Sequence, residues 1–130
     1  MQLGGLPRQS IVADAADTTS AKAAVAEILA RFGRIDVLVC NAATNPAYGP
    51  MSRLEDGQFR KILETNVIAN HWLIQMVAPQ MLARKDGAIL VISSIGGLRG
   101  NALIGAYNIS KAADMQLVRN LAVEWGDRGV

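Results

Sequence analysis

Residues 88–111 read AILVISSIGGLRGNALIGAYNISK, an apolar run followed by two serines, a glycine-containing segment and a tyrosine–lysine pair. The run Ala88–Ile92 predicts a buried strand, because its side chains are apolar without alternation. The two serines that follow lie at the carboxyl end of this strand, where open α/β sheets bind ligands. Tyr107 and Lys111 are four residues apart, a spacing that places both side chains on one face of a helix. The sequence therefore predicts hydroxyl, phenol and ammonium groups near one end of a sheet.

These groups support acid–base chemistry. A phenol loses its proton near pH ~10, and a cation beside it favours the phenolate. Ser94 precedes Tyr107 by 13 residues, and its hydroxyl can polarise a substrate oxygen. A tyrosine four residues before a lysine is common by chance, but chance does not readily add the preceding strand and this separation. We therefore expect proton transfer to or from a substrate oxygen.

The combination resembles the short-chain dehydrogenase/reductase family, whose catalytic core is a serine followed at this separation by Tyr-x-x-x-Lys. The resemblance implies that Tyr107 is the general acid/base, and that Lys111 lowers the pKa of this phenol and binds the nicotinamide ribose. It implies that Ser94 orients the substrate. Ser93 is then a structural neighbour, although a shift of one residue would exchange the two serines. The implied cofactor is NAD or NADP, and the implied substrate is an alcohol or carbonyl compound.

Composition limits the class of protein. The 130 residues predict a single domain over 1–130, and 51% hydrophobic with 18% charged residues indicates a globular chain. The net charge of +2, without a basic run, argues against nucleic-acid binding, and the apolar runs are too short to span a bilayer. Cys40 is the single cysteine, which excludes an internal disulfide and favours a reducing compartment. One cysteine and one histidine supply no metal cluster. No secretory signal is recognisable at the start, and a cytoplasmic location is predicted.

The amino-terminal part predicts a loop over 1–8, a short strand over Ser10–Ala13 and a helix over Ala21–Phe32. Thr18 or Thr19 is expected to cap this helix, with Asp17 either capping or facing solvent. Helical patterns also extend over residues 54–83, where Pro79 predicts a kink or the last turns, and over residues 107–127.

The resemblance places the cofactor against two segments. Asp14 ends the first predicted strand; it suits a turn, or, as the resemblance implies, it accepts a hydrogen bond from the adenine amino group, which we favour. The family carries Asn-Asn-Ala-Gly after its fourth strand, and residues 40–43 read Cys-Asn-Ala-Ala after the predicted strand Ile35–Cys40. Ala42 and Ala43 are small enough for an adenosine ribose to approach, although Ala43 is larger than glycine. Asn41 is expected to tie the central strands together beside the cofactor.

Asn66 is a polar residue on the apolar stripe of the helix predicted over 54–83. A buried amide needs hydrogen-bond partners, so one interpretation is a satisfied core amide. In the family, an asparagine of the catalytic set holds a water in the proton relay to the lysine. The position of Asn66, 28 residues before Ser94, agrees with that role, and we favour it.

The resemblance covers only part of the family's doubly wound, Rossmann-like parallel sheet. The family begins with a Thr-Gly-x-x-x-Gly-x-Gly turn, which neither Gly4-Gly5 nor Gly96-Gly97 matches. In the strand order 3-2-1-4-5-6, the predicted strands are numbers three, four and five. Strands one and two normally separate three from four, so the third strand lacks its family neighbour and the fourth has an open edge.

Two hypotheses follow. The chain carries the catalytic half of an NAD(P)-dependent oxidoreductase, with weak or no turnover by itself. Alternatively, it is a non-catalytic fragment or interaction module. In either case the helices over 54–83 and 107–127 are expected to pair between subunits, because the resemblance implies a four-helix dimer face. A serine hydrolase is a poor third candidate, since no Gly-x-Ser-x-Gly is present.

Overall fold

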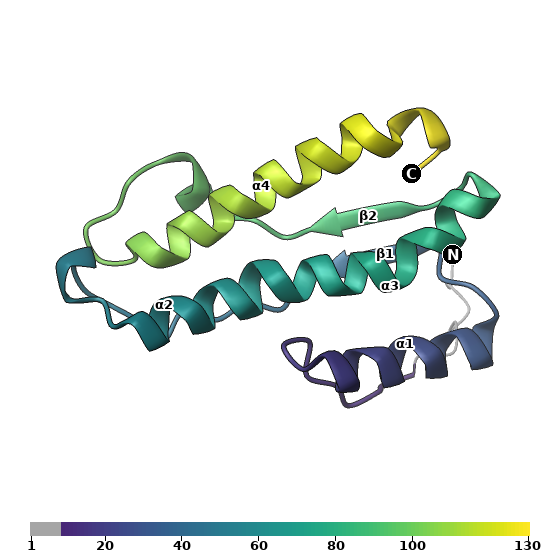
Figure 1. Ribbon diagram of the computed structural model, residues 1–130, viewed down its shortest axis with the longest axis horizontal. Helices are drawn as coiled ribbons and strands as arrows, with labels where there is room; N and C mark the ends of the chain where they lie inside the picture. Colours follow the sequence, from purple (N-terminus) through teal and green to yellow (C-terminus); the bar gives the residue numbers. More distant parts are fainter. Residues whose placement is uncertain (1–8) are drawn as a thin grey trace, which may run out of the picture.

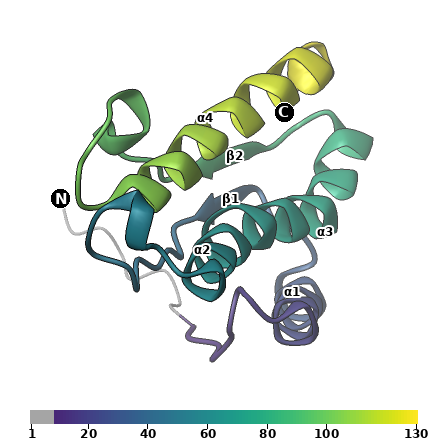
Figure 2. The same cartoon turned by 60° about the vertical axis from the view of Figure 1, so that its left-hand side comes forward.

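The computed structural model describes residues 9–130, so the loop predicted over 1–8 lies outside the described residues. Within this part, the chain forms helices on one side of a two-stranded parallel sheet (Figures 1 and 2). The main elements are α1 (Thr18–Phe32), β1 (Val37–Cys40), α2 (Asp56–Leu63), α3 (Ala69–Arg84), β2 (Ala88–Val91) and α4 (Gly105–Trp125). Shorter helical turns are η1 (Met51–Arg53), η2 (Glu64–Ile68), η3 (Ile95–Leu98) and η4 (Gly126–Arg128).

The sheet joins two of the strands that the sequence predicts. β1 and β2 pair in parallel, with Val37 opposite Ala88 and Cys40 opposite Val91. The backbone N–H of Ile92 also donates to the carbonyl of Cys40, at 2.9 Å, which extends the pairing to the carboxyl end. The expected parallel α/β arrangement of these two strands is confirmed.

One face of this sheet carries the core. Leu38 and Cys40 from β1, with Ile89 and Val91 from β2, pack against Ile74 and Ala78 of α3 and Trp125 of α4. On α3, Val77 and Met81 also contact Val25 of α1, so the three helices share one layer (Figure 1). The alternate strand residues Val37, Val39 and Leu90 are about half exposed. The sheet therefore has one covered and one uncovered face.

The strand predicted over Ser10–Ala13 is wrong. These residues have no regular secondary structure, and Val12 is fully exposed. A strand needs a neighbour to accept and donate its backbone hydrogen bonds, and within residues 9–130 the sheet consists of β1 and β2 alone. The local pattern of apolar residues was present without the pairing that would make it a strand.

The helix that follows begins earlier than predicted. Helix α1 starts at Thr18, and its N-cap is Asp17, whose carboxylate accepts a hydrogen bond from the Thr19 N–H at 3.0 Å. The expectation that Thr18 or Thr19 caps the helix is therefore wrong, and the capping interpretation of Asp17 is confirmed. The helix ends as predicted at Gly33, which adopts a left-handed conformation with φ of 78°.

The long helix predicted over 54–83 forms over Asp56–Arg84, with one irregularity. Between α2 and α3, the five residues of η2 form a π-helix, and the residues that flank it keep helical dihedral angles. A π-turn holds one more residue than an α-turn. Pro79 lies in the last turns of α3, which continues to Arg84, as one of the two predictions stated. The irregular segment contains Asn66, which is completely buried.

Candidate active site

The carboxyl end of β2 lies against the first turns of α4. Ser94 is the N-cap of η3, and its hydroxyl accepts a hydrogen bond from the Gly96 N–H at 3.1 Å. Ser93 donates from its hydroxyl to the carbonyl of Lys111, at 2.8 Å. At Gly97, a Cβ atom would lie 2.8 Å from the carbonyl carbon of Lys111, so η3 packs directly on the backbone of α4. The close approach brings both serines beside the amino-terminal half of α4.

Lys111 lies on α4 one turn after Tyr107, as the spacing predicts. Its ammonium nitrogen is 5.8 Å from the centre of the Tyr107 ring. The Lys111 side chain is 3% exposed, whereas Tyr107 is half-buried. Lys111 Nζ donates to the carbonyl of Ile92, at 2.7 Å, and to Asp114 Oδ2, at 3.1 Å. The lysine thus connects the end of β2 to the face of α4 that carries the tyrosine.

Asp114 and Asn70 join Tyr107, Lys111 and the two serines in one cluster, and the sequence pattern did not single out either of them. Asp114 is fully buried, and its Oδ1 accepts a hydrogen bond from Asn70 Nδ2 at 3.0 Å. Burial raises the pKa of Asp114, and the hydrogen bonds from Lys111 and Asn70 oppose that increase. The available signal was a carboxylate three residues after Lys111, on the same helix face. Its partner on α3 is 44 residues away in sequence.

Cys40 is the other titratable group near this carboxylate. Burial, and secondly the charge of Asp114, raise the pKa of the Cys40 thiol to about 11. The thiol is 2% exposed and packs in the core. It is therefore a protonated core residue at neutral pH.

Asn66 uses its whole side-chain amide within the protein. Its Oδ1 accepts from the Thr44 N–H at 2.7 Å, and its Nδ2 donates to the Thr44 carbonyl and to Ser110 Oγ, both at 3.0 Å. The Ser110 hydroxyl in turn donates to the carbonyl of Tyr107, at 2.7 Å. The backbone carbonyl of Asn66 accepts from Asn70 Nδ2 at 2.7 Å. The amide thus ties the loop after β1 to α4, which agrees with the interpretation as a satisfied core amide.

The residues predicted to bind cofactor lie in two places. Asn41, Ala42 and Ala43 are exposed and follow the carboxyl end of β1. Within the described residues, no hydrogen bond joins the Asn41 amide to β2; the backbones of Cys40 and Ile92 make the tie that was expected of it. Asp14 is also exposed, and its carboxylate accepts a hydrogen bond from the Ala16 N–H at 2.9 Å. This contact is the one expected of a residue that forms a turn.

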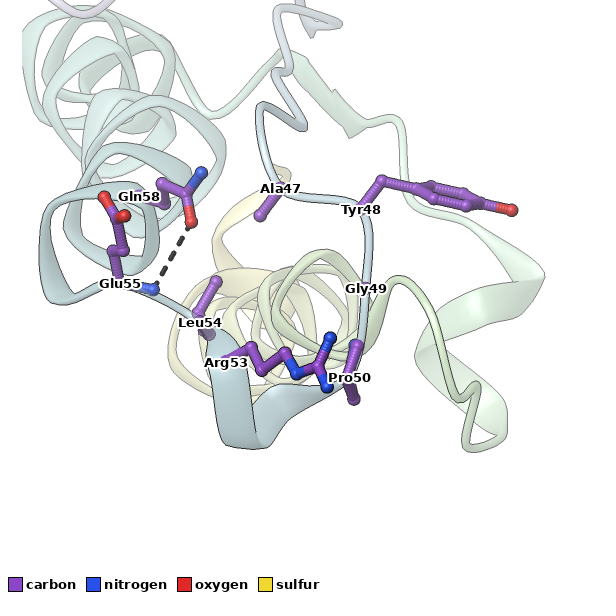
Figure 3. Close-up of a pocket in the computed structure, with 8 residues that line it drawn as sticks. All are labelled: Ala47, Tyr48, Gly49, Pro50, Arg53, Leu54, Glu55 and Gln58. Carbon is purple, nitrogen blue, oxygen red and sulfur yellow. Dashed lines mark hydrogen bonds between the residues drawn. The ribbon is translucent and has the colours of Figure 1, made fainter.

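Two surface pockets lie near the cluster without including its residues. One, of about 260 Å³, lies between the loop after β1 and the start of α2 (Figure 3), and its lining residues are Ala47, Tyr48, Gly49, Pro50, Arg53, Leu54, Glu55 and Gln58. In Figure 3 the Tyr48 ring extends away from the other labelled side chains. A second, of about 370 Å³, lies over η3 and the start of α4 and includes Gly96 and Gly97. Neither pocket contains Tyr107 or Lys111.

Comparison with known proteins places this arrangement in a family. The family model described as short chain dehydrogenase matches residues 5–130. The chain belongs to this family. Dehydrogenase/reductase SDR family member 4 of Sus scrofa is 39% identical over 98 residues, which are 75% of this chain and 35% of that protein. The chain spans about a third to a half of the length of the curated relatives it matches.

Solved structures of short-chain dehydrogenases share the fold. One from Streptomyces avermitilis has a TM-score of 0.86 and 35% identity, over 92% of this chain and 44% of that one. A gluconate 5-dehydrogenase from Burkholderia cenocepacia, in complex with NADP and tartrate, has a TM-score of 0.82 and 29% identity, over 89% and 45% of the two chains. An NAD⁺-bound xylitol dehydrogenase has a TM-score of 0.85 and 26% identity, over 91% and 45%. Neighbours of this fold are thus crystallised with either dinucleotide, in agreement with the predicted NAD or NADP. Among residues 9–130, no helix has the length and apolar character needed to cross a membrane.

Proposed function

We propose that this short-chain dehydrogenase chain carries the catalytic residues of an NAD(P)-dependent oxidoreductase that acts on an alcohol or carbonyl substrate. The observation that carries the proposal is the Lys111 ammonium, held 5.8 Å from the centre of the Tyr107 ring. The nicotinamide cofactor supplies or accepts the hydride at the substrate carbon. Tyr107 acts at the substrate oxygen, to which it gives a proton in reduction and from which it takes one in oxidation.

Lys111 has two roles in this proposal. Its positive charge stabilises the phenolate that forms when Tyr107 gives up its proton. Lysine has three N–H donors, and the structure accounts for two of them, to Ile92 and Asp114. The third suits a ribose hydroxyl of the nicotinamide half of the cofactor. The donor set of Lys111 therefore fits NAD or NADP.

The remaining predicted residues have supporting roles. Ser94 has its hydroxyl at the end of β2, where it can donate to the substrate oxygen while it accepts from Gly96. Asn66 fixes the Thr44 end of the loop after β1 against α4. The exposed, small residues Ala42 and Ala43, next to Asn41, leave room for the adenosine ribose. Asp14 would accept a hydrogen bond from the adenine amino group. One oxygen of its carboxylate bonds to the Ala16 N–H in the turn, and the other is left for this contact.

The test compares two tyrosine variants of the same chemical change. Tyr107→Phe removes the proton donor, and we expect loss of all NAD(P)H-dependent carbonyl reduction. Tyr48→Phe is the matched control, because Tyr48 is 78% exposed and lies outside the cluster. Turnover is followed as NADH or NADPH absorbance with a panel of ketones, and cofactor binding as NAD(P)H fluorescence. Activity retained by Tyr107→Phe would contradict the assigned role, and a folded wild-type chain that binds neither dinucleotide would favour the non-catalytic alternative.

The proposed assembly is a homo-oligomer through the helices over 54–83 and 107–127. The support is apolar side chains on the outer surface of these helices: Ile68 on η2, and Ile109, Val118 and Val123 on α4, are 38–88% exposed. Light scattering at micromolar concentration tests it, and a monomer would contradict pairing. The cytoplasmic location stays a prediction based on the single cysteine.

A further inference from the structure

Asp114 is a buried carboxylate that the proposed proton transfer does not use. It lies on the face of α4 that carries Tyr107 and Lys111, three residues after Lys111 and seven residues after Tyr107. Its side chain has no exposed surface. A charged group without a partner in such a place is strongly unfavourable, so each of its oxygen atoms needs a donor.

Both oxygens of the Asp114 carboxylate have a hydrogen-bond donor. Oδ2 accepts from Lys111 Nζ at 3.1 Å, and Oδ1 accepts from Asn70 Nδ2 at 3.0 Å. Asn70 is itself fixed, since the same nitrogen donates to the carbonyl of Asn66 at 2.7 Å. The carboxylate is therefore held from α3 and presents a fixed negative charge to the lysine.

The charge also acts on the tyrosine. Lys111 Nζ is 3.1 Å from the Asp114 carboxylate and 5.8 Å from the centre of the Tyr107 ring, so the carboxylate lies at most about 9 Å from the ring. At that separation, a negative charge opposes formation of a phenolate, whereas the ammonium favours it.

We propose that Asp114 is a positioning residue that holds the Lys111 ammonium and, as its counter-ion, weakens the effect of that charge on Tyr107. The inference rests on the proposed role of Tyr107 as general acid/base. In this chain, the lysine acts on the tyrosine as one member of a buried ion pair. The pair keeps the phenol protonated to higher pH than the lysine alone would allow.

The other groups around the Asp114 carboxylate do not reverse its effect on phenolate formation at Tyr107. Asn70 on α3 and the carbonyl of Ile92 after β2 are neutral. The Cys40 thiol on β1 is titratable and close enough for Asp114 to influence it, but it ionises only near pH 11. Lys111 is therefore the one cation that the described residues place against Asp114.

The experiment titrates the phenol of Tyr107 directly, by absorbance at 295 nm, in a Tyr48→Phe background that leaves one tyrosine in the chain. We expect Asp114→Asn to move the midpoint to lower pH, by about 0.3 to 1.4 units, as Coulomb's law gives for a unit charge at 9 Å with effective dielectric constants of 80 and 20. Lys111→Met should move it in the opposite direction. Asp114→Glu should restore the wild-type value, and the exposed Asp127→Asn, the same chemical change, should leave it unchanged.

A merely structural role of Asp114 would give different directions for the shifts in the titration midpoint. Loosening of the cluster would move the midpoints of the Asp114 and Lys111 variants in the same direction, and that result, or no shift for Asp114→Asn, would overturn the inference. If Asp114→Asn does not fold, the double variant Lys111→Met/Asp114→Leu removes both buried charges, and its midpoint must lie below that of Lys111→Met alone. The titration needs neither cofactor nor turnover. Absence of dinucleotide binding would thus count against the proposed function without altering the expected midpoint shifts of the Asp114 and Lys111 variants.

Discussion

Asn66→Asp separates the hydrogen-bonding role of Asn66 from its shape, because it replaces an NH₂ group by an oxygen and leaves the volume almost unchanged. Asn66 is fully buried, and its Nδ2 makes the two donor contacts, to the Thr44 carbonyl and to Ser110 Oγ. The serine cannot reverse its bond without cost, since its own hydrogen goes to the Tyr107 carbonyl. The variant therefore loses two hydrogen bonds and directs an oxygen at two other oxygens.

The expected loss of unfolding free energy follows from these contacts. Two hydrogen bonds at about 1 kcal/mol each, with the additional cost of desolvating an oxygen that has no donor, give about 2–4 kcal/mol at pH 7. The acceptor contact from the Thr44 N–H is retained. A protonated carboxyl group would again donate one hydrogen bond, so its pKa in the folded state is raised above the unfolded value. The deficit should then be smallest at low pH and increase as pH rises.

Urea unfolding followed by circular dichroism, at pH 7 and at pH 4.5, measures this quantity. Asn120→Asp is the matched control: Asn120 is exposed on α4, its Oδ1 accepts from Gln116, and the change should stay within about 0.5 kcal/mol. A loss for Asn66→Asp no larger than for the control, or a loss that does not depend on pH, would refute the assignment of Nδ2 as the essential donor.

Two other perturbations test the packing of the site. Gly97→Ala should destabilise the chain by about 1–3 kcal/mol and lower any dehydrogenase activity, because its Cβ would lie 2.8 Å from the Lys111 carbonyl carbon; Gly100→Ala has open space and is the control in the same denaturation and turnover assays. The Cys40 thiol should not react with a disulfide reagent at pH 8 until urea unfolds the chain, and rapid reaction of the folded chain would contradict its burial. Because the pKa of Cys40 is raised from 9.0 to about 11, its contribution to stability is present below pH 9 and lost by pH 11, by roughly 3 kcal/mol, a loss that Cys40→Ser should not show.

The sequence predicted those features that depend on local pattern. The two apolar runs form β1 and β2, because they pair with each other and bury alternate residues against the same helices. The spacing of Tyr107 and Lys111 required only a helix to bring them together. The Ser10–Ala13 prediction was wrong for the complementary reason, since a strand is defined by its partner and the pattern of one segment does not contain that information.

The ion pair at the candidate site shows a second limit. Asn70 and Asp114 meet across two helices, 44 residues apart in sequence, and the contact depends on how α3 and α4 pack. The pattern of residues 107–127 marked Lys111 as functional but gave no reason to ask which group neutralises its buried charge. The same holds for Asn66, whose three contacts to Thr44 and Ser110 join segments far apart in sequence. Its role in holding a water of the proton relay stays a prediction.

The π-turn between α2 and α3 gives this helical segment one point at which its length can change without rotating one end relative to the other. An α-helix turns by about 100° per residue, so removing one residue within α3 would rotate the residues after it by that angle and turn their apolar side chains out of the core. Removing one residue from Glu64–Ile68 would instead convert the wide turn to an α-turn and leave α3 in phase with α2. Substitutions at the exposed Glu64 and Ile68 leave this phase intact as well. Among natural or engineered versions of this segment, a single-codon deletion should therefore be tolerated at the π-turn better than inside α3.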